Sequence, residues 1–116
     1  MSRVNLEDSV MERPLIRTGL KMGITSLPNA NANIDADMGP VLTCTPSASR
    51  TFTLPAVTKD MRGLTLYFVN NAAFTLVINN AAAAAVATVP ATIGATGMIV
   101  CLGDSALGIG GWTGGL

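Results

Sequence analysis

The sequence predicts an all-β protein: a small antiparallel β-sandwich or barrel, jelly-roll-like, with an extended N-terminal arm. In segment 50–54 (RTFTL), polar and apolar side chains alternate, as they do in a strand with one buried face. Segments 64–69 and 74–78 are rich in β-branched and aromatic residues, which favour strands. Short apolar segments recur about every ten residues with turn signals between them, which is typical of sandwiches and barrels.

The three strands at 50–54, 64–69 and 74–78 are expected to form an antiparallel meander. Pro55 ends the first strand, because proline has no N–H to donate to a ladder. A polar loop then runs to Gly63. The second and third strands are separated by Asn70-Asn71-Ala72-Ala73, which predicts a turn, since asparagine tolerates the left-handed region and bonds its own backbone.

Segment 41–45 (VLTCT) predicts a strand that pairs with 50–54 as a hairpin. Residues 26–33 have the composition of a loop. The spacing of Asp35, Asp37 and Gly39 is similar to the start of a calcium loop, but the third oxygen ligand and the later glutamate of that pattern are missing. We therefore predict a local turn and no metal site.

The last third of the chain predicts weaker elements. The five alanines at 81–85 indicate a loop or one helical turn leading into an extended segment at 86–90. Segment 98–102 (MIVCL) is continuously apolar and is expected to be a strand buried on both faces. Segment 107–112 predicts a final weak strand, and Trp112 is expected to be a core or interface anchor.

Length and composition indicate one sandwich domain (25–116) that follows the arm (1–24). Charged residues are 12% of the 116 residues, against about 25% in typical soluble proteins. The net charge is zero, so neither a nucleic-acid partner nor an anionic membrane surface is expected. After Arg62 the only charged residue is Asp104. The simplest account is that other copies or another protein cover much of this uncharged surface.

The arm contains half of the charges and predicts a docking segment. Arg13 and Arg17 lie four residues apart around Leu15 and Ile16, an apolar anchor between basic contacts. The alternative interpretation is a frayed terminus with solvated charges. The residues that we expect to dock are Arg3, Arg13, Leu15, Ile16, Arg17 and Lys21.

A membrane-spanning segment is not expected. Residues 81–102 are long enough to span, but polar residues, glycine and proline interrupt them, and no basic cluster flanks them. The first residues lack the apolar region of a secretory signal, which indicates synthesis in a cytoplasm. Cys44 and Cys101 are then expected to be reduced, small buried hydrophobes, and a disulfide would require closely paired strands.

An enzyme is not expected either. The chain has no histidine, which excludes Ser–His and Cys–His nucleophiles, and the two cysteines lack the spacing of a zinc site. The glycines of 108–113 do not match a dinucleotide-binding spacing. We predict no catalytic residue and no cofactor.

The order of several motifs resembles the small β-sandwich modules of tailed bacteriophages, which recur in capsid decoration (cement) proteins and in tail-fibre or tailspike segments. The motifs are ThrPheThrLeuPro at 51–55, Gly63, LeuTyrPheValAsn at 66–70, LeuValIleAsn at 76–79, Gly103-Asp104 and Trp112. The alanine run at 81–85 and the glycine-rich ending depart from this rhythm.

The resemblance implies a structural virion protein, made in the bacterial host cytoplasm, that forms a homotrimer and binds the major capsid protein on the outside of a phage head. The sandwich would form the oligomer core, while the arm would lie across the shell. We expect Phe68, Phe74, Ile99 and Trp112 in the oligomer core. The alternatives are a tail-fibre or tailspike module, which would carry surface aromatics for a host receptor, and a membrane-embedded holin-like peptide.

Overall fold

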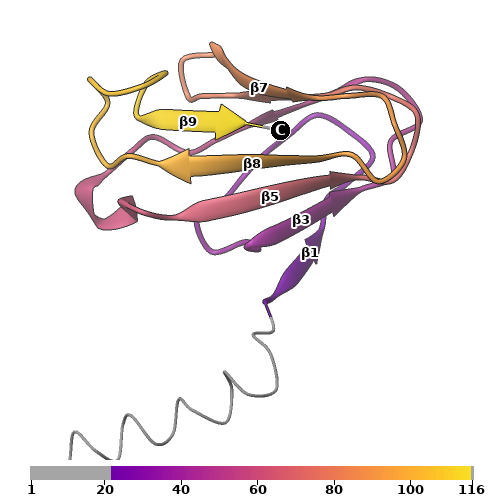
Figure 1. Ribbon diagram of the computed structural model, residues 1–116, viewed down its shortest axis with the longest axis horizontal. Helices are drawn as coiled ribbons and strands as arrows, with labels where there is room; N and C mark the ends of the chain where they lie inside the picture. Colours follow the sequence, from indigo (N-terminus) through magenta and orange to yellow (C-terminus); the bar gives the residue numbers. More distant parts are fainter. Residues whose placement is uncertain (1–21, 116) are drawn as a thin grey trace, which may run out of the picture.

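The structure is a computed structural model and describes residues 22–115. Two sheets pack face to face (Figure 1), which confirms the predicted all-β sandwich. Sheet A has five strands in the order β1 (Ile24–Ser26), β3 (Val41–Cys44), β5 (Thr65–Asn70), β8 (Thr96–Cys101) and β9 (Trp112–Gly115). Sheet B has four strands in the order β2 (Ala32–Asn33), β4 (Arg50–Thr53), β6 (Leu76–Asn79) and β7 (Ala85–Val89). A 3₁₀ turn, η1 (Lys59–Met61), precedes β5.

From β1 to β6 the chain alternates between the two sheets. Strands β1, β3 and β5 are therefore parallel neighbours in sheet A, and β2, β4 and β6 are parallel neighbours in sheet B. Antiparallel pairing begins only with the later strands, in the pairs β5–β8, β6–β7 and β8–β9. Each parallel pair is thus connected through a strand of the opposite sheet.

This topology corrects two predictions. The segments 50–54, 64–69 and 74–78 are strands, but they do not form an antiparallel meander, because β5 lies in a different sheet from β4 and β6. The hairpin predicted for 41–54 is also absent, since β3 and β4 lie in opposite sheets. The connections carry buried apolar residues, namely Leu27, Ile34 and Leu54, whose burial draws each connection across the core instead of back along the same sheet.

The core lies between the inner faces of the two sheets. The rings of Phe52 on β4 and Phe68 on β5 stack across it with centroids 6.4 Å apart. Trp112 is fully buried, as predicted for a core residue. Burying each large apolar side chain contributes roughly 1.5–3 kcal/mol. The other buried apolar residues are Leu27, Ile34, Leu42, Cys44, Leu54, Leu66, Leu76, Ile78, Val86, Val89, Ile99 and Cys101.

Three boundaries differ from the sequence-based expectation. The short strands β1 and β2 lie within segments predicted as arm or loop, and Ile24, which was placed in the arm, begins β1. The last strand spans 112–115 instead of 107–112, because positive φ angles at Gly108, Gly110 and Gly111 fold that segment into a tight loop.

The alanine run forms the turn between β6 and β7, which confirms a loop leading into an extended segment. Asn80 lies at the start of this turn, and its backbone N–H donates to the carbonyl of Ala84 (2.8 Å). Ala83 lies in the left-handed region (φ 66°), which makes a helical turn impossible at that point. β7 then begins at Ala85.

Strand β8 is not buried on both faces, contrary to the prediction from its continuous apolar sequence. Ile99 points into the core and is fully buried, whereas Met98 points outward and is 44% exposed. The reason is that the second face of sheet A packs against no other element within residues 22–115.

The two cysteines are free and buried, which confirms that they act as small hydrophobic core residues. Cys44 lies on β3 and Cys101 on β8, and β5 runs between these strands, so their strands are not paired. Burial raises the pKa of the Cys44 thiol above its ordinary value, and the nearby Arg50 guanidinium partly opposes this rise. A thiol in this environment stays protonated and unreactive at neutral pH.

Candidate functional site

The most unusual surface is the outer face of sheet A, the face of the five-stranded sheet that points away from the core. Strand register places Ile24, Val41, Tyr67 and Met98 directly beside one another in a row across four strands. Ile24 is 68% exposed, and Val41 and Tyr67 are half-buried by their neighbours. The row forms a continuous apolar stripe with one hydroxyl, that of Tyr67.

Two further rows flank this stripe, and neither contains a charged residue. On one side Ser26, Thr43, Val69 and Thr96 share the register of the four strands. On the other side lie Thr65, Val100 and Thr113. The outer face of sheet A is therefore apolar at its centre and carries hydroxyl groups toward both strand ends.

The strands of sheet A build this face because they are apolar at consecutive positions. In β3, Leu42 points inward and Val41 outward, and in β5 Phe68 points inward and Tyr67 outward. A strand with one solvated face normally alternates between apolar and polar residues. Consecutive apolar residues are instead typical of strands that are covered on both faces.

The outer face of sheet B has a different chemistry. Its central row consists of Thr51, Val77 and Thr88 on β4, β6 and β7. A shallow groove of about 350 Å³ at its edge is lined by Asn31, Asn33 and the threonines of β4. These side chains hydrogen-bond readily to water, so this face is compatible with solvent.

The charges of the sandwich are concentrated at one end. The loops before β3, before β5 and after β8 lie at this end, because β3 and β5 are parallel and β8 is antiparallel to them. Figure 1 shows η1 and the β8–β9 loop together on the left. Six of the seven charged residues within 22–115 lie in these loops: Asp35, Asp37, Lys59, Asp60, Arg62 and Asp104. The seventh, Arg50, lies at the opposite end, where its Nε donates to Asn29 Oδ1 (3.0 Å).

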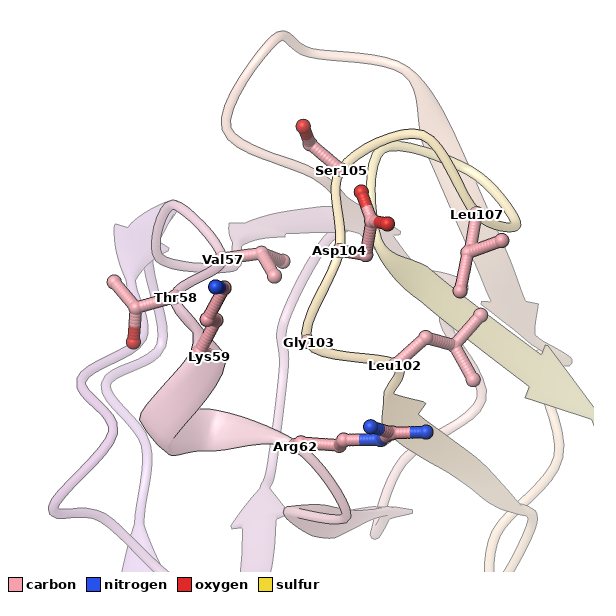
Figure 2. A pocket seen from close by; sticks show the side chains of 9 residues that line it. All are labelled: Val57, Thr58, Lys59, Arg62, Leu102, Gly103, Asp104, Ser105 and Leu107. Carbon is pink, nitrogen blue, oxygen red and sulfur yellow. The ribbon is translucent and has the colours of Figure 1, made fainter.

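An open cleft of about 660 Å³ lies between the β4–β5 connection and the β8–β9 loop at the charged end. Figure 2 shows Lys59 and Arg62 on one wall and Asp104 with Ser105 on the other. Gly103 (φ 76°) allows the close approach of these walls, because a Cβ there would lie 2.7 Å from Arg62 Cβ. The Asp104 carboxylate accepts a hydrogen bond from the Ala106 N–H (2.9 Å) and so shapes its own turn.

Chemically, this cleft offers solvated charges of both signs beside the apolar side chains of Val57, Leu102 and Leu107. Such a mixture suits polar contacts at the rim of a protein interface. Its charged side chains, Lys59, Arg62 and Asp104, are exposed.

Two buried asparagines fix the loops at opposite ends of the sandwich. Asn70 Nδ2 donates to the carbonyls of Phe74 (2.6 Å) and Pro90 (2.9 Å), and Asn70 Oδ1 accepts from the Ala72 N–H (3.1 Å). Asn80 is arranged similarly: its Oδ1 accepts from the N–H groups of two alanines, and its Nδ2 donates to the Ile109 carbonyl (3.3 Å). The turn predicted at 70–73 is therefore present, and it joins the two sheets.

The predicted site residues fall into three groups. The docking residues Arg3, Arg13, Leu15, Ile16, Arg17 and Lys21 lie outside the described residues. Three of the residues expected in the oligomer core, Phe68, Ile99 and Trp112, are fully buried within one chain and form its intramolecular core. The fourth, Phe74, is 41% exposed near the β5–β6 turn and has surface for a partner.

Sequence reasoning missed the outer face of sheet A. Its residues Ile24, Tyr67 and Met98 were assigned to the arm or to strands treated as core. The available signal was the consecutive apolar residues in β3, β5 and β8, which indicate a covered second face but not what covers it.

Within residues 22–115, no group of three or more metal-ligating side chains is gathered, and no helix is both long and apolar enough to cross a membrane. Neither the protein-family models, nor the curated proteins, nor the solved structures with which the chain was compared gave a match.

Proposed function

We propose that this chain is a structural virion protein: a capsid decoration protein that oligomerises on the outer surface of a phage head and stabilises the shell. The observation that carries the proposal is the outer face of sheet A, which is apolar and uncharged and which no other element within residues 22–115 covers. Large exposed apolar patches on a folded protein are typical of protein–protein interaction sites. We therefore expect this face to be buried against another protein surface.

The motifs that carry the resemblance occupy points that define the fold. ThrPheThrLeuPro at 51–55 coincides with β4 and its end, and Gly63 (φ 87°) provides the turn into β5. Asn70 links the sheets, and Gly103-Asp104 begins the loop that leads to the buried Trp112. These residues are therefore structural markers of the sandwich.

In the proposed mechanism, the sandwich forms the oligomer, a homotrimer by the resemblance, and the arm binds the major capsid protein. Arg13 and Arg17 would flank the apolar anchor Leu15-Ile16 against the shell. Several identical arms on one oligomer bind with avidity, so modest single contacts bridge neighbouring shell subunits and oppose internal pressure.

The test is co-sedimentation of the full chain with empty, expanded phage heads. The heads come from the phage that carries the gene for this chain and are assembled in the absence of the chain. We expect saturable binding, and we expect the Arg13→Glu/Arg17→Glu variant to bind at least about tenfold more weakly, since reversed charges oppose the same contacts. The matched control is Lys59→Glu/Arg62→Glu, the same charge change at the exposed end of the sandwich. Failure of the unaltered chain to bind heads would refute the decoration role.

A tail-fibre or tailspike module is the second candidate, and the aromatic surface favours it. Phe74 is exposed, and Tyr67 lies on the outer face of sheet A, so two of the aromatic residues are available for stacking on a glycan. Binding of the labelled chain to host cells but not to heads, lost in Phe74→Ala, would favour this candidate.

A further inference from the structure

We infer that the outer face of sheet A is the surface through which copies of this chain associate, with Tyr67 and Met98 near its centre. The inference rests on the proposed function in one respect: both require that the chain forms an oligomer. It adds which surface is used, and that a second copy of the chain covers this surface. Other occupants that the surface could accommodate are residues 1–21 of the same chain and the shell itself.

The absence of charge on this face is the first argument for a second copy. Around a symmetry axis, residues near the axis approach copies of themselves, so any charge there meets the same charge. The three rows of the outer face carry only apolar and hydroxyl side chains, although charged residues are present elsewhere in the sandwich. The face can therefore meet itself without electrostatic repulsion.

Its size is the second argument. Five strands about 4.8 Å apart, with about five residues at about 3.3 Å each, give a face of about 400 Å². Two such faces bury about 800 Å², which lies below the roughly 1,200 Å² at which stable interfaces begin, so rim contacts must add the rest. An interface of this size predicts association that depends on protein concentration.

Residues 1–21 are a poorer cover for the same face. They carry seven charged residues: Arg3, Glu7, Asp8, Glu12, Arg13, Arg17 and Lys21. Laying this segment on the apolar stripe would remove charged groups from water without offering them partners there, which is unfavourable. The hydroxyl groups of a second copy, by contrast, can pair with those of the first.

The experiment measures the mass of the full chain by sedimentation velocity at several concentrations. We expect a mass at least twice the 11.9 kDa of a single chain. Met98→Glu should raise the apparent dissociation constant at least about tenfold, because it places like charges together at the axis. Met98 is exposed in the single chain, so the new carboxylate stays hydrated and the variant should fold with an unchanged circular dichroism spectrum.

Thr88→Glu is the matched control, since it adds the same charge at an exposed position on the outer face of sheet B. It should leave the mass unchanged. A single-chain mass for the unaltered protein at all concentrations would overturn the inference. So would a folded Met98→Glu variant that keeps the unaltered mass.

Two further results separate the occupants. Loss of association in Leu15→Glu but not in Met98→Glu would assign assembly to the arm and overturn the inference. A single-chain protein that binds heads through Met98 would assign the face to the shell, which overturns the inference but supports the decoration role. Association that Met98→Glu weakens, in a protein that never binds heads, would support the inference and refute the decoration role.

Discussion

The outer faces of the two sheets both lie on mixed parallel and antiparallel strands but differ in their side chains. Across sheet A the central row is Ile24, Val41, Tyr67 and Met98, and across sheet B it is Thr51, Val77 and Thr88. Threonine has the strand-favouring branched shape of valine but carries a hydroxyl that water can solvate. The comparison teaches that side chains decide whether a sheet face suits solvent or a partner.

The largest expected effect separates the inner and outer faces of one strand. Phe68→Ala should lower the free energy of unfolding by about 3–5 kcal/mol, because it leaves a cavity against Phe52 in the core. Tyr67→Ala, at the neighbouring position, should lower it by less than about 1 kcal/mol, because Tyr67 lies on the outer face.

Urea denaturation in the Met98→Glu background would measure both values without a contribution from association. Equal losses for the two variants would mean that the outer face is already buried within a single chain. That result would remove the contrast between the outer faces of the two sheets.

The next effect concerns the link between the sheets. Asn70→Ala should lower the free energy of unfolding by about 2–4 kcal/mol, because the fully buried Asn70 amide is lost and the carbonyls of Phe74 and Pro90 lose their donor. The control is Asn71→Ala, an exposed neighbour in the same turn, which should change stability by less than about 0.5 kcal/mol. Thermal unfolding followed by circular dichroism measures both, and equal stabilities would show that Asn70 does not hold the sheets together.

The smallest effect on stability comes from giving sheet B the chemistry of sheet A. In Thr51→Val/Thr88→Val the central row of sheet B becomes entirely valine, and the free energy of unfolding should change by less than about 0.5 kcal/mol. The change should appear instead as new association beyond that of the unaltered chain, measured by light scattering. Unchanged scattering would mean that sheet A associates through more than its apolar row.

The sequence was sufficient to predict the longer strands, but neither the short strands β1 and β2 nor the pairing of the strands. The alternation in 50–54 identifies which residues share a face, and β4 has its buried residue Phe52 where the pattern placed it. The same alternation fits a hairpin and a crossing to the opposite sheet equally well. The choice depends on contacts such as Asn70 with Pro90, which are 20 positions apart and have no local signature.

The candidate site was harder to predict for a related reason. The apolar segment 98–102 indicates a strand, but within residues 22–115 only the face of Ile99 is buried, while Met98 on the other face is exposed. Sequence reasoning placed Met98 in the core and chose Ile99 and Trp112 for contacts between chains. Only the sheet register shows that Met98 lies beside Tyr67, Val41 and Ile24 in one exposed row.

The alternation of the early strands between the sheets also has a consequence for synthesis on the ribosome. The first pairs that can form during synthesis are the parallel pairs β1–β3 and β2–β4. In each pair, a strand of the opposite sheet is synthesised between the two partners, so pairing is delayed until that strand has emerged. Contacts between distant parts of a chain form slowly, because loop closure must precede them. Strand β5 thus keeps one unpaired edge until β8 is made, and nascent chains growing on one messenger would be prone to associate through such edges during that interval.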